Sequence, residues 1–420
     1  MMTRVLNGYA VCIYAATAVL AGCAGSQWPI SAPSSSLARS NINAALGHVG
    51  KPRHYQVLYS FGSSPDGSVP EGNLIDVGGT LYGTTYYGGS RNFYGTVFSI
   101  TTGGAEKVLH SFGRRPDGEN PLAGLIDVNG TLYGTAFVGG KGCNCGTVYS
   151  INTSGKEKLT YDFGQIPDGE DPRATLVELN GTLYGTTWQG GVSSCPEQSC
   201  GTVFSVTPGG TEKVLHSLTE AEGYASIAGL INVGGTLYGT ASKGGAYSDG
   251  TVFSITPAGR MKMLHSFGRG SDGADPQASL VDVSGTLYGT TRHGGAHSCS
   301  DSGGTQSCGT VFSITTSGAE KVLYNFSQND GCYPVANLIE VKGTLYGTTS
   351  YCGADGYVGG TVFSLTTAGK ERVLHTFDQY TDGYAPEAGL LDVDGTLYGT
   401  TAAGGTTGHY GYGTVFALTL

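Results

Sequence analysis

Charged residues are scarce in this chain: Asp, Glu, Lys and Arg make up 13% of the 420 residues, and the net charge is −10. No run of Lys or Arg is longer than two residues. Because nucleic-acid binding depends on clustered basic side chains that displace counterions, that class of function is excluded. The same bulk charge disfavours polyanionic glycans as ligands, although a local basic patch would override it.

Familiar catalytic motifs are missing as well. The sequence contains no GxSxG, no HExxH and no phosphate-binding loop, and no nucleophile stands at a readable spacing from a base. The cysteines lack the CxxC…CxxC and CxxC…HxxxH spacings of structural zinc sites. We therefore predict no catalytic residue, no metal site and no cofactor.

Glycine, in contrast, is abundant at 72 residues, and many of these glycines belong to a repeated sequence unit. The string GTLYGT occurs seven times, beginning at residues 79, 130, 181, 235, 285, 343 and 395. A string close to GTVFSI follows each copy, and a string close to KVLHSF also occurs seven times. A period of about fifty residues indicates a propeller or a solenoid.

Each unit reads as four short strands. In the second unit we expect strands at 125–128, 131–135, 146–151 and 157–163, with Asn129-Gly130 as a two-residue hairpin turn. Segments with helical periodicity are absent. Four antiparallel strands in each of seven units predict an all-β, seven-bladed propeller.

The phase of the repeats favours a closed ring over a solenoid. The repeats begin with a lone outermost strand, Gln56–Phe61, and end with three strands, through Leu420, that lack an outermost partner. Pairing these two ends completes one blade and removes both open sheet edges. A solenoid would instead require polar caps.

The unit resembles the Gloeo/Verruco tandem repeat of exported bacterial proteins in its text GTLYGTT…GG…GTVFSIT…G.EKVLHSF…PDG, and it is loosely similar to kelch blades. The resemblance covers residues 55–420. It implies a propeller and an exported, surface-anchored protein. It implies no chemistry, because the family brings no established activity.

The N-terminus has the features of an export signal. Residues 1–22 combine Arg4 with an interrupted apolar stretch that is too short for a clear membrane span. The segment ends in Leu20-Ala21-Gly22-Cys23, which resembles the lipobox of bacterial lipoproteins, and the resemblance implies lipidation of Cys23. The alternative is an ordinary secretory signal cleaved near Ala24. Residues 23–54 then form a flexible linker to a propeller at 55–420.

We accordingly expect a monomeric lipoprotein of the bacterial cell envelope, in the periplasm or at the cell surface, whose lipid holds it to a membrane. Eight cysteines follow the leader in four close pairs. An even number of loop cysteines fits an oxidising compartment. The predicted disulfides are Cys195–Cys200, Cys299–Cys308 and Cys332–Cys352, while a bond between Cys143 and Cys145 is left open because one residue separates them.

Loop length indicates the functional face. The loops between the second and third strands, and those between blades, are long and variable, whereas the other turns are short. Loops held by a rigid scaffold commonly carry binding residues. The candidate ligand-binding residues follow the second strand in their units: Tyr86, Tyr87, Phe137, Trp188, Arg292, His293, Tyr351 and Tyr410. Packing between loops is the alternative role for these side chains.

Polar residues recur at three positions of the repeat, and each position has two possible roles, one structural and one functional. An Asp-Gly pair recurs between blades, as at Asp117, and either supplies carboxylates to ligands or holds a turn. A polar residue in the first strand, as at Asp127, either lines the channel or bonds the adjacent turn. The outer-strand histidines, as at His110, we interpret as structural.

Three functions fit these observations. The first is a surface module that binds a glycan or a protein, favoured by low charge, regular repeats and the tether. The second is a carbohydrate-active hydrolase or lyase with carboxylates on the long-loop face. The third is a purely structural envelope protein.

Overall fold

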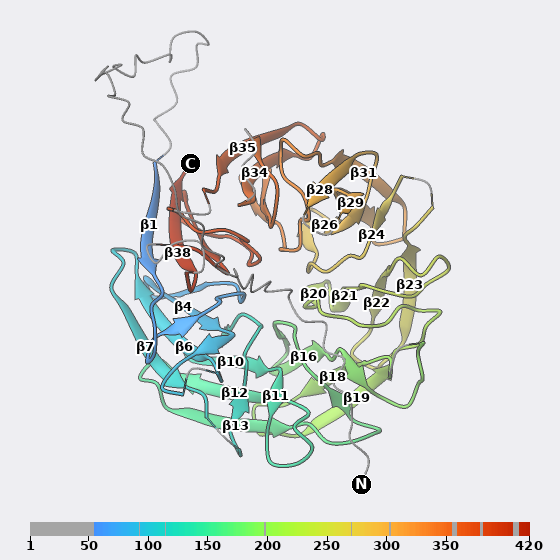
Figure 1. Ribbon diagram of the computed structural model, residues 1–420. Helices are drawn as coiled ribbons and strands as arrows, with labels where there is room; N and C mark the ends of the chain where they lie inside the picture. Colours follow the sequence, from blue (N-terminus) through green and yellow to red (C-terminus); the bar gives the residue numbers. More distant parts are fainter. Residues whose placement is uncertain are drawn as a thin grey trace, which may run out of the picture. The chain divides into compact units, whose positions relative to one another are not determined.

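The computed structural model describes residues 54–420, except residues 92, 114, 197–198, 270, 302–303, 355–358, 379–380 and 406–410. Residues 51–420 form one compact unit. Seven four-stranded antiparallel sheets follow one another around a ring, coloured from blue to red along the chain (Figure 1). This part of the chain is therefore a seven-bladed β-propeller, as the repeats predict. Within the described residues, no helical segment has the length and apolar character of a membrane span.

Each blade has four strands, numbered here from the axis outward. The first strands are β3 (Ile75–Val77), β9 (Ile126–Val128), β15 (Val177–Leu179), β20 (Ile231–Val233), β25 (Val281–Val283), β32 (Ile339–Val341) and β36 (Leu391–Val393). The second strands are β4 (Thr80–Thr85), β10 (Thr131–Ala136), β16 (Thr182–Thr186), β21 (Thr236–Ala241), β26 (Thr286–Thr291), β33 (Thr344–Thr349) and β37 (Thr396–Thr401). The third strands are β6 (Thr96–Thr101), β12 (Thr147–Asn152), β18 (Thr202–Val206), β22 (Thr251–Ile255), β30 (Thr310–Thr315), β34 (Thr361–Thr366) and β38 (Thr414–Thr419). The fourth strands are β7 (Glu106–Ser111), β13 (Glu157–Asp162), β19 (Glu212–Ser217), β23 (Met261–Ser266), β31 (Glu320–Asn325), β35 (Glu371–Thr376) and β1 (Tyr55–Ser60).

The last blade joins the two ends of the repeat region. Its strand order is β36, β37, β38 and β1, and β1 pairs antiparallel with β38 from Tyr55 opposite Leu418 to Ser60 opposite Thr414. Figure 1 shows the blue β1 beside the red β38. The predicted closure is confirmed, and it leaves no open edge where the ring meets itself.

The turn between the first two strands is a two-residue hairpin turn in which both central residues have positive φ. In the second blade these are Asn129 (φ 54°) and Gly130 (φ 80°), as a type I′ turn requires. The polar residue of the first strand bonds this turn, since Gly130 N donates to Asp127 Oδ1 at 2.9 Å. The same bond recurs in all seven blades. The structural reading of this position is therefore confirmed.

Aromatic rings of the third strands fill the space between blades. Phe98, Tyr149, Phe204, Phe253, Phe312, Phe363 and Phe416 are all buried. The ring of Phe98 lies over Gly83 of GTLYGT, where a Cβ atom would come within 2.6 Å of its Cζ, so this position accepts no side chain. Six of the seven Tyr residues of GTLYGT are buried, and Tyr346 is partly exposed.

Edge-to-face aromatic pairs link neighbouring blades. Phe61, after the outermost strand β1 of the last blade, meets Phe98 of the first blade with ring centroids 5.2 Å apart. Equivalent pairs recur at five more interfaces. In the third blade, Leu218 takes the place of the phenylalanine and is also fully buried. The packing between blades is thus as periodic as the sequence.

A threonine hydroxyl also crosses every interface between blades. The last Thr of GTLYGT donates from Oγ1 to a backbone carbonyl of the next blade at 2.8–3.4 Å, as in Thr84 to Ala123. The carbonyls belong to the segments that lead into the first strands, and the seventh bond, from Thr400 to Pro70, closes the ring. These bonds hold the segments nearest the axis in place.

Short two-stranded sheets order the long loops of four blades. They pair the loop between blades with the loop after the second strand: β2 (Gly67–Ser68) with β5 (Tyr87–Gly88), β8 (Gly118–Glu119) with β11 (Val138–Gly139), β14 (Gly169–Glu170) with β17 (Gln189–Gly190), and β24 (Gly273–Ala274) with β27 (His293–Gly294). A separate hairpin, β28 (Ser298–Asp301) and β29 (Gly304–Ser307), fills the longest loop. Both kinds of long loop therefore lie on the same face, called the long-loop face below.

We predict that Thr290→Val lowers the free energy of unfolding by about 1–3 kcal/mol, because the buried carbonyl of Ala336 loses its hydrogen-bond donor. Urea unfolding followed by circular dichroism measures this change. Thr316→Val, at an exposed turn position, is the matched control and should leave stability nearly unchanged. Equal effects of the two substitutions would show that the bond between blades contributes nothing.

Candidate ligand-binding site

A cavity of about 100 Å³ lies on the axis of the ring, at the long-loop face. Its lining comes from all seven blades, specifically from the segments that lead into the first strands. We call this cavity the channel mouth. Because each of these segments is held by a threonine of the preceding blade, the framework of the channel mouth is rigid.

One position in each blade gives the channel mouth its chemistry. In six blades this residue precedes a repeated alanine, and in the first blade it precedes Gly72. The seven residues are Glu71, Leu122, Arg173, Ile227, Gln277, Val335 and Glu387. The backbone around them repeats while their side chains do not, so a symmetric scaffold carries an asymmetric site.

Asparagine side chains narrow the channel beside this ring. Asn73 of the first blade donates from Nδ2 to Oδ1 of Asn337, two blades away, at 2.8 Å. Asn73 Oδ1 accepts from Gly389 N at 2.6 Å. A Cβ atom at Gly389 would lie 2.4 Å from Asn337 Oδ1, so the residues here are packed tightly. They form a polar floor for the channel mouth.

Arg173 is held between two aromatic rings. Its guanidinium carbon lies 4.3 Å from the ring centroid of Phe137 and 3.9 Å from that of Trp188. Burial lowers the pKa of Arg173, and the neighbouring Asp171, Tyr86 and Glu71 oppose this effect. Cation–π contact with two rings stabilises the charged group and fixes its plane.

A second arginine, Arg292, adds positive charge near the channel mouth. Arg292 lies 5.9 Å from the ring centroid of Tyr333 and interacts electrostatically with Asp275 and Glu387. Asp275 in turn accepts a hydrogen bond from Gln277 Nε2 at 2.8 Å. Since Gln277 and Glu387 line the cavity, Arg292 adds positive charge at its edge.

The carboxyl groups of the channel mouth hold their protons more tightly than free ones. Burial raises the pKa of Glu71 to about 8, with a further contribution from Glu387 and an opposing one from Arg173. Burial raises the pKa of Glu387 as well, against the effect of Arg292. For Asp171, burial raises the pKa to about 7 while Arg173 lowers it. At neutral pH the arginine charges are therefore only partly offset.

Four of the predicted ligand-binding residues lie around the channel mouth. Phe137 and Trp188 hold Arg173, Tyr86 interacts electrostatically with Arg173, and Arg292 acts on Glu387. Tyr87 is exposed beside Tyr86, with ring centroids 4.3 Å apart. Tyr86, Phe137 and Trp188 therefore act on Arg173, and Arg292 acts on Glu387; both Arg173 and Glu387 line the cavity.

The other predicted residues pack between loops or lie outside the described part. The ring of His293 meets Tyr333 edge-on at 5.3 Å, and Tyr351 stacks parallel to Tyr333 at 6.2 Å. Both side chains are half-buried. Tyr410 lies outside the described residues. Packing is thus part of the role of His293 and Tyr351.

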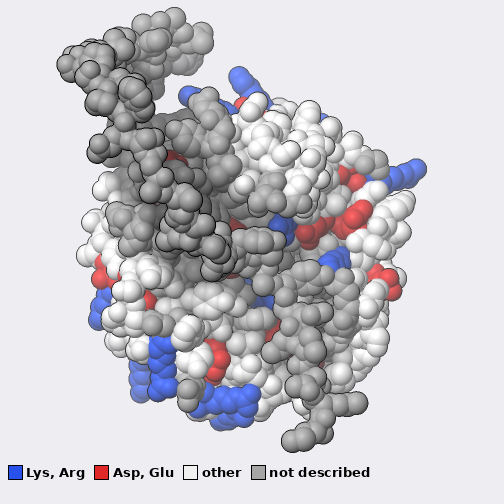
Figure 2. Space-filling view, viewed as in Figure 1, with Lys and Arg blue, Asp and Glu red and all other residues white. Residues whose placement is uncertain are grey.

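Exposed hydrophobic side chains concentrate on the same face. Seven large ones are exposed among the described residues, and only Met263, on the outer strand β23, lies elsewhere. The other six, called the hydrophobic rim, are Tyr87, Phe93, Ile166, Val192, Tyr247 and Tyr412. Where Figure 2 draws described residues, most of the surface is neither acidic nor basic, and many of the Lys and Arg side chains stand at the outline. The six side chains come from loops of several blades, so most of the exposed large apolar side chains of the described residues lie on the long-loop face.

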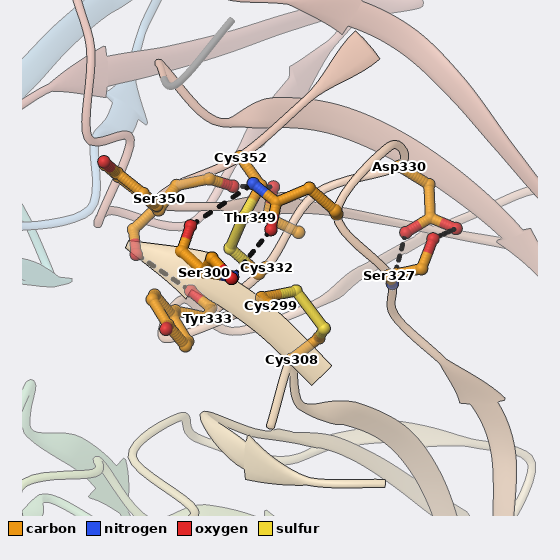
Figure 3. Close-up of a disulfide and its surroundings, with 12 residues drawn as sticks. Cys299, Ser300, Cys308, Ser327, Asp330, Cys332, Tyr333, Thr349, Ser350 and Cys352 are labelled. Carbon is orange, nitrogen blue, oxygen red and sulfur yellow. Dashed lines mark hydrogen bonds between the residues drawn. A yellow bond between two sulfur atoms is a disulfide. The ribbon is translucent and has the colours of Figure 1, made fainter. Parts of the chain in front are cut away.

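All four cysteine pairs are bonded, including the pair left open above: Cys143–Cys145, Cys195–Cys200, Cys299–Cys308 and Cys332–Cys352. Figure 3 shows the last two disulfides side by side, and the sulfurs of Cys299, Cys332 and Cys352 lie within 4.8 Å of one another. Because these sulfurs are already bonded to partners, they are not free metal ligands. The two disulfides join the core between the fifth and sixth blades.

The repeated Asp-Gly pairs are turns. Asp117 accepts backbone hydrogen bonds from Gly113 at 3.0 Å and Gly118 at 2.9 Å, and its other neighbour is His110 Nε2 at 3.2 Å. His216, His265 and His375 contact an acidic residue in the same way, and Tyr59, Tyr161 and Tyr324 replace the histidine elsewhere. The structural reading of these carboxylates and histidines is therefore confirmed.

Glu157 brings a third side chain to this cluster, so His110, Asp117 and Glu157 have ligand atoms within 4.8 Å of one another. Tyr59, Asp66 and Glu106 make an equivalent cluster at another interface, where tyrosine replaces the histidine. A tyrosine hydroxyl bonded to Asp66 fulfils the same role without any metal ligand at that position. We interpret these clusters as contacts between blades.

Sequence reasoning missed the residues at the centre of the site. Glu71, Arg173, Gln277 and Glu387 each follow a proline at one fixed position of the repeat. The signal was present, because this position carries acidic, basic, amide and aliphatic residues between regular parts of the repeat. Only the fold shows that the seven positions meet on the axis.

Comparisons with known proteins agree with the fold. A family model described as the Gloeobacter/Verrucomicrobia repeat matches residues 47–197, 193–301 and 297–420. A search of curated proteins finds no match. Among solved structures, virginiamycin B lyase from Staphylococcus aureus is similar with a TM-score of 0.59 and 13% identity, over 88% of this chain and 99% of the lyase. Citrobacter koseri AztD is similar with a TM-score of 0.43 and 13% identity, over 78% and 80% of the two chains. At 13% identity, the likeness to the lyase shows the fold alone.

We predict that the protein is less stable at pH 8 than at pH 5. Burial and a neighbouring Asp raise the pKa of five glutamates between blades from 4.5 to about 7: Glu106, Glu157, Glu212, Glu320 and Glu371. The folded state then holds protons that the unfolded chain has released, so stability falls as pH rises from 4.5 to about 7.

Thermal unfolding across this pH range measures the effect. Replacing all five glutamates by Gln should flatten the decline and raise the melting temperature at pH 8. Glu220→Gln, at an exposed position, is the control. A pH profile unchanged by the fivefold substitution would contradict the assignment.

Proposed function

The chain belongs to the Gloeobacter/Verrucomicrobia repeat family, and we propose that it is a binding module whose ligand is a glycan held on the long-loop face. The observation that carries this proposal is the convergence of unlike side chains on one symmetric axis. A purely structural ring has no use for six different residue types at seven equivalent positions. Ligands commonly bind where a rigid scaffold presents variable side chains.

Polar groups in the channel mouth favour a glycan over a peptide ligand. Carboxyl, amide and guanidinium groups of Glu71, Arg173, Gln277 and Glu387 line the cavity, and three aliphatic side chains complete the ring. Peptide recognition centres on deep apolar pockets, whereas sugars present many hydroxyl groups. The aromatic members of the hydrophobic rim offer flat surfaces to the apolar faces of sugar rings.

The enzyme alternative receives less support. Glycoside hydrolysis requires two carboxyl groups with separated pKa values, one acting as acid and one as nucleophile or base. At the channel mouth, burial moves the pKa values of Glu71 and Glu387 in the same direction. This arrangement suits hydrogen bonding to a ligand better than proton transfer.

The cellular location belongs to the same proposal. An exported lipoprotein of the cell envelope would present this module to extracellular glycans, with the lipid on Cys23 as anchor. Cys23 lies outside the described residues, and the support is the lipobox-like sequence.

We expect Cys23→Ser to abolish fatty-acid labelling and to release the protein from membranes. Unchanged membrane association would argue for an uncleaved apolar leader.

We predict that Tyr87→Ser combined with Phe93→Ser weakens glycan binding about tenfold or more, since burying a large apolar side chain contributes about 1.5–3 kcal/mol. Binding is measured on a glycan array and then by calorimetry with the purified full-length chain. Met263→Ser, at the exposed hydrophobic position on the outer strand β23, is the control and should not change affinity. Failure to bind any glycan would reject the proposed function.

A further inference from the structure

Two side-chain nitrogen atoms are buried without a hydrogen-bond partner among the described residues, and both are arginine Nε atoms at the channel mouth: Arg173 and Arg292. Nor do the described residues place a carboxylate in ion-pair contact with either guanidinium. Both residues are partly exposed, but a buried Nε–H without an acceptor is costly, because its lost hydration is not replaced. Both arginines therefore lack an acceptor that a ligand could supply.

Resting on the proposed function, we propose that the channel mouth binds an acidic sugar residue whose carboxylate accepts hydrogen bonds from Arg173, with Arg292 as the second positive charge. The Arg173 guanidinium carbon lies over the rings of Phe137 and Trp188, 4.3 and 3.9 Å from their centroids. Contacts of this kind use the face of a guanidinium and leave the N–H groups at its edge for polar partners. The planar fork of this edge matches the two oxygens of a carboxylate.

The nearby carboxyl groups complete the site for a sugar. Glu71 and Glu387 line the cavity and make no hydrogen bond to another described residue. Their raised pKa values favour the protonated form, which both donates and accepts hydrogen bonds, as a sugar hydroxyl does. For Glu71, whose pKa is raised to about 8, this form also reduces the repulsion of a ligand carboxylate at neutral pH. The polar floor formed by Asn73 and Asn337 limits how deeply the sugar enters.

The channel mouth thus differs from the protein as a whole. The chain carries a net charge of −10, which disfavours long polyanions. The cavity of about 100 Å³ accommodates one acidic group rather than a run of them. We therefore expect recognition of a single acidic residue, at a chain end or a branch, with neighbouring sugars resting on the hydrophobic rim.

Trp188 provides the readout, because it stacks on Arg173. The protein has two tryptophans, so Trp28→Phe leaves Trp188 as the single tryptophan. The probes are an oligogalacturonate and its carboxyl-reduced, neutral counterpart of the same linkage and length. We expect the acidic oligosaccharide to change Trp188 fluorescence and to bind about 10- to 100-fold more tightly than the neutral one. Calorimetry with the full chain checks the affinities.

Arg173→Gln should remove this preference, and Arg173→Lys should restore it only partly, because lysine keeps the charge but not the planar fork. Arg260→Gln, an exposed position in the short turn after β22, is the matched control and should bind like the unaltered protein. Circular dichroism establishes that each variant is folded. Arg292→Gln tests the second charge if Arg173→Gln does not fold.

The outcomes separate the two proposals. Equal affinity for acidic and neutral oligosaccharides, or acid binding unchanged by both arginine substitutions, overturns this inference and leaves the glycan-binding module intact. Equally tight binding of a sulfated oligosaccharide overturns the carboxylate specificity. Binding of an acidic peptide with no binding of any oligosaccharide rejects both proposals, as does the absence of all binding.

Discussion

The hydrogen bond from the last threonine of GTLYGT to the neighbouring blade is the contact on which the rest of the architecture depends. It is made seven times, at 2.8–3.4 Å, and it always ends on the segment that leads into a first strand. Farther from the axis, edge-to-face aromatic pairs join the blades at six of the seven interfaces, and Leu218 takes the place of one ring at the seventh. Each interface therefore has one contact near the axis and one farther out. The ring therefore fixes the backbone of its own channel mouth before any ligand is present.

A fixed backbone lets the side chains at the axis differ without cost to the fold. Arg173 and Glu71 enter the cavity from equivalent places, yet one is a cation between two aromatic rings and the other a carboxyl group with a raised pKa. The aromatic partners of Arg173 come from the long loops, which the small two-stranded sheets hold against the loops between blades. Repetition thus builds the scaffold, and departure from repetition builds the site.

Periodicity explains why so much of the fold could be predicted from the sequence. The repeated sequence motifs predict the strands and the Asn129-Gly130 turn, and the point at which the repeats begin predicts the closure by Gln56–Phe61. Asp127 and His110 have the structural roles expected of residues that recur in the repeats. The site was reached only in part. Phe137, Trp188 and Arg292 stood out as irregular residues in long loops, but Arg173 lies between Pro172 and Ala174 in a segment that looks regular. Its importance depends on seven blades meeting at one axis, which is a property of the closed ring and not of any single repeat.

The central claim is that the axis of the long-loop face, and Arg173 in particular, is where this propeller meets its ligand. A crystal structure of the protein with a short oligogalacturonate tests it most directly. The account predicts density for one sugar in the channel mouth, with its carboxylate at hydrogen-bond distance from Arg173 and further sugars along the hydrophobic rim. Well-ordered sugar on the outer strands or on the short-turn face, with the channel mouth holding only solvent, would contradict it.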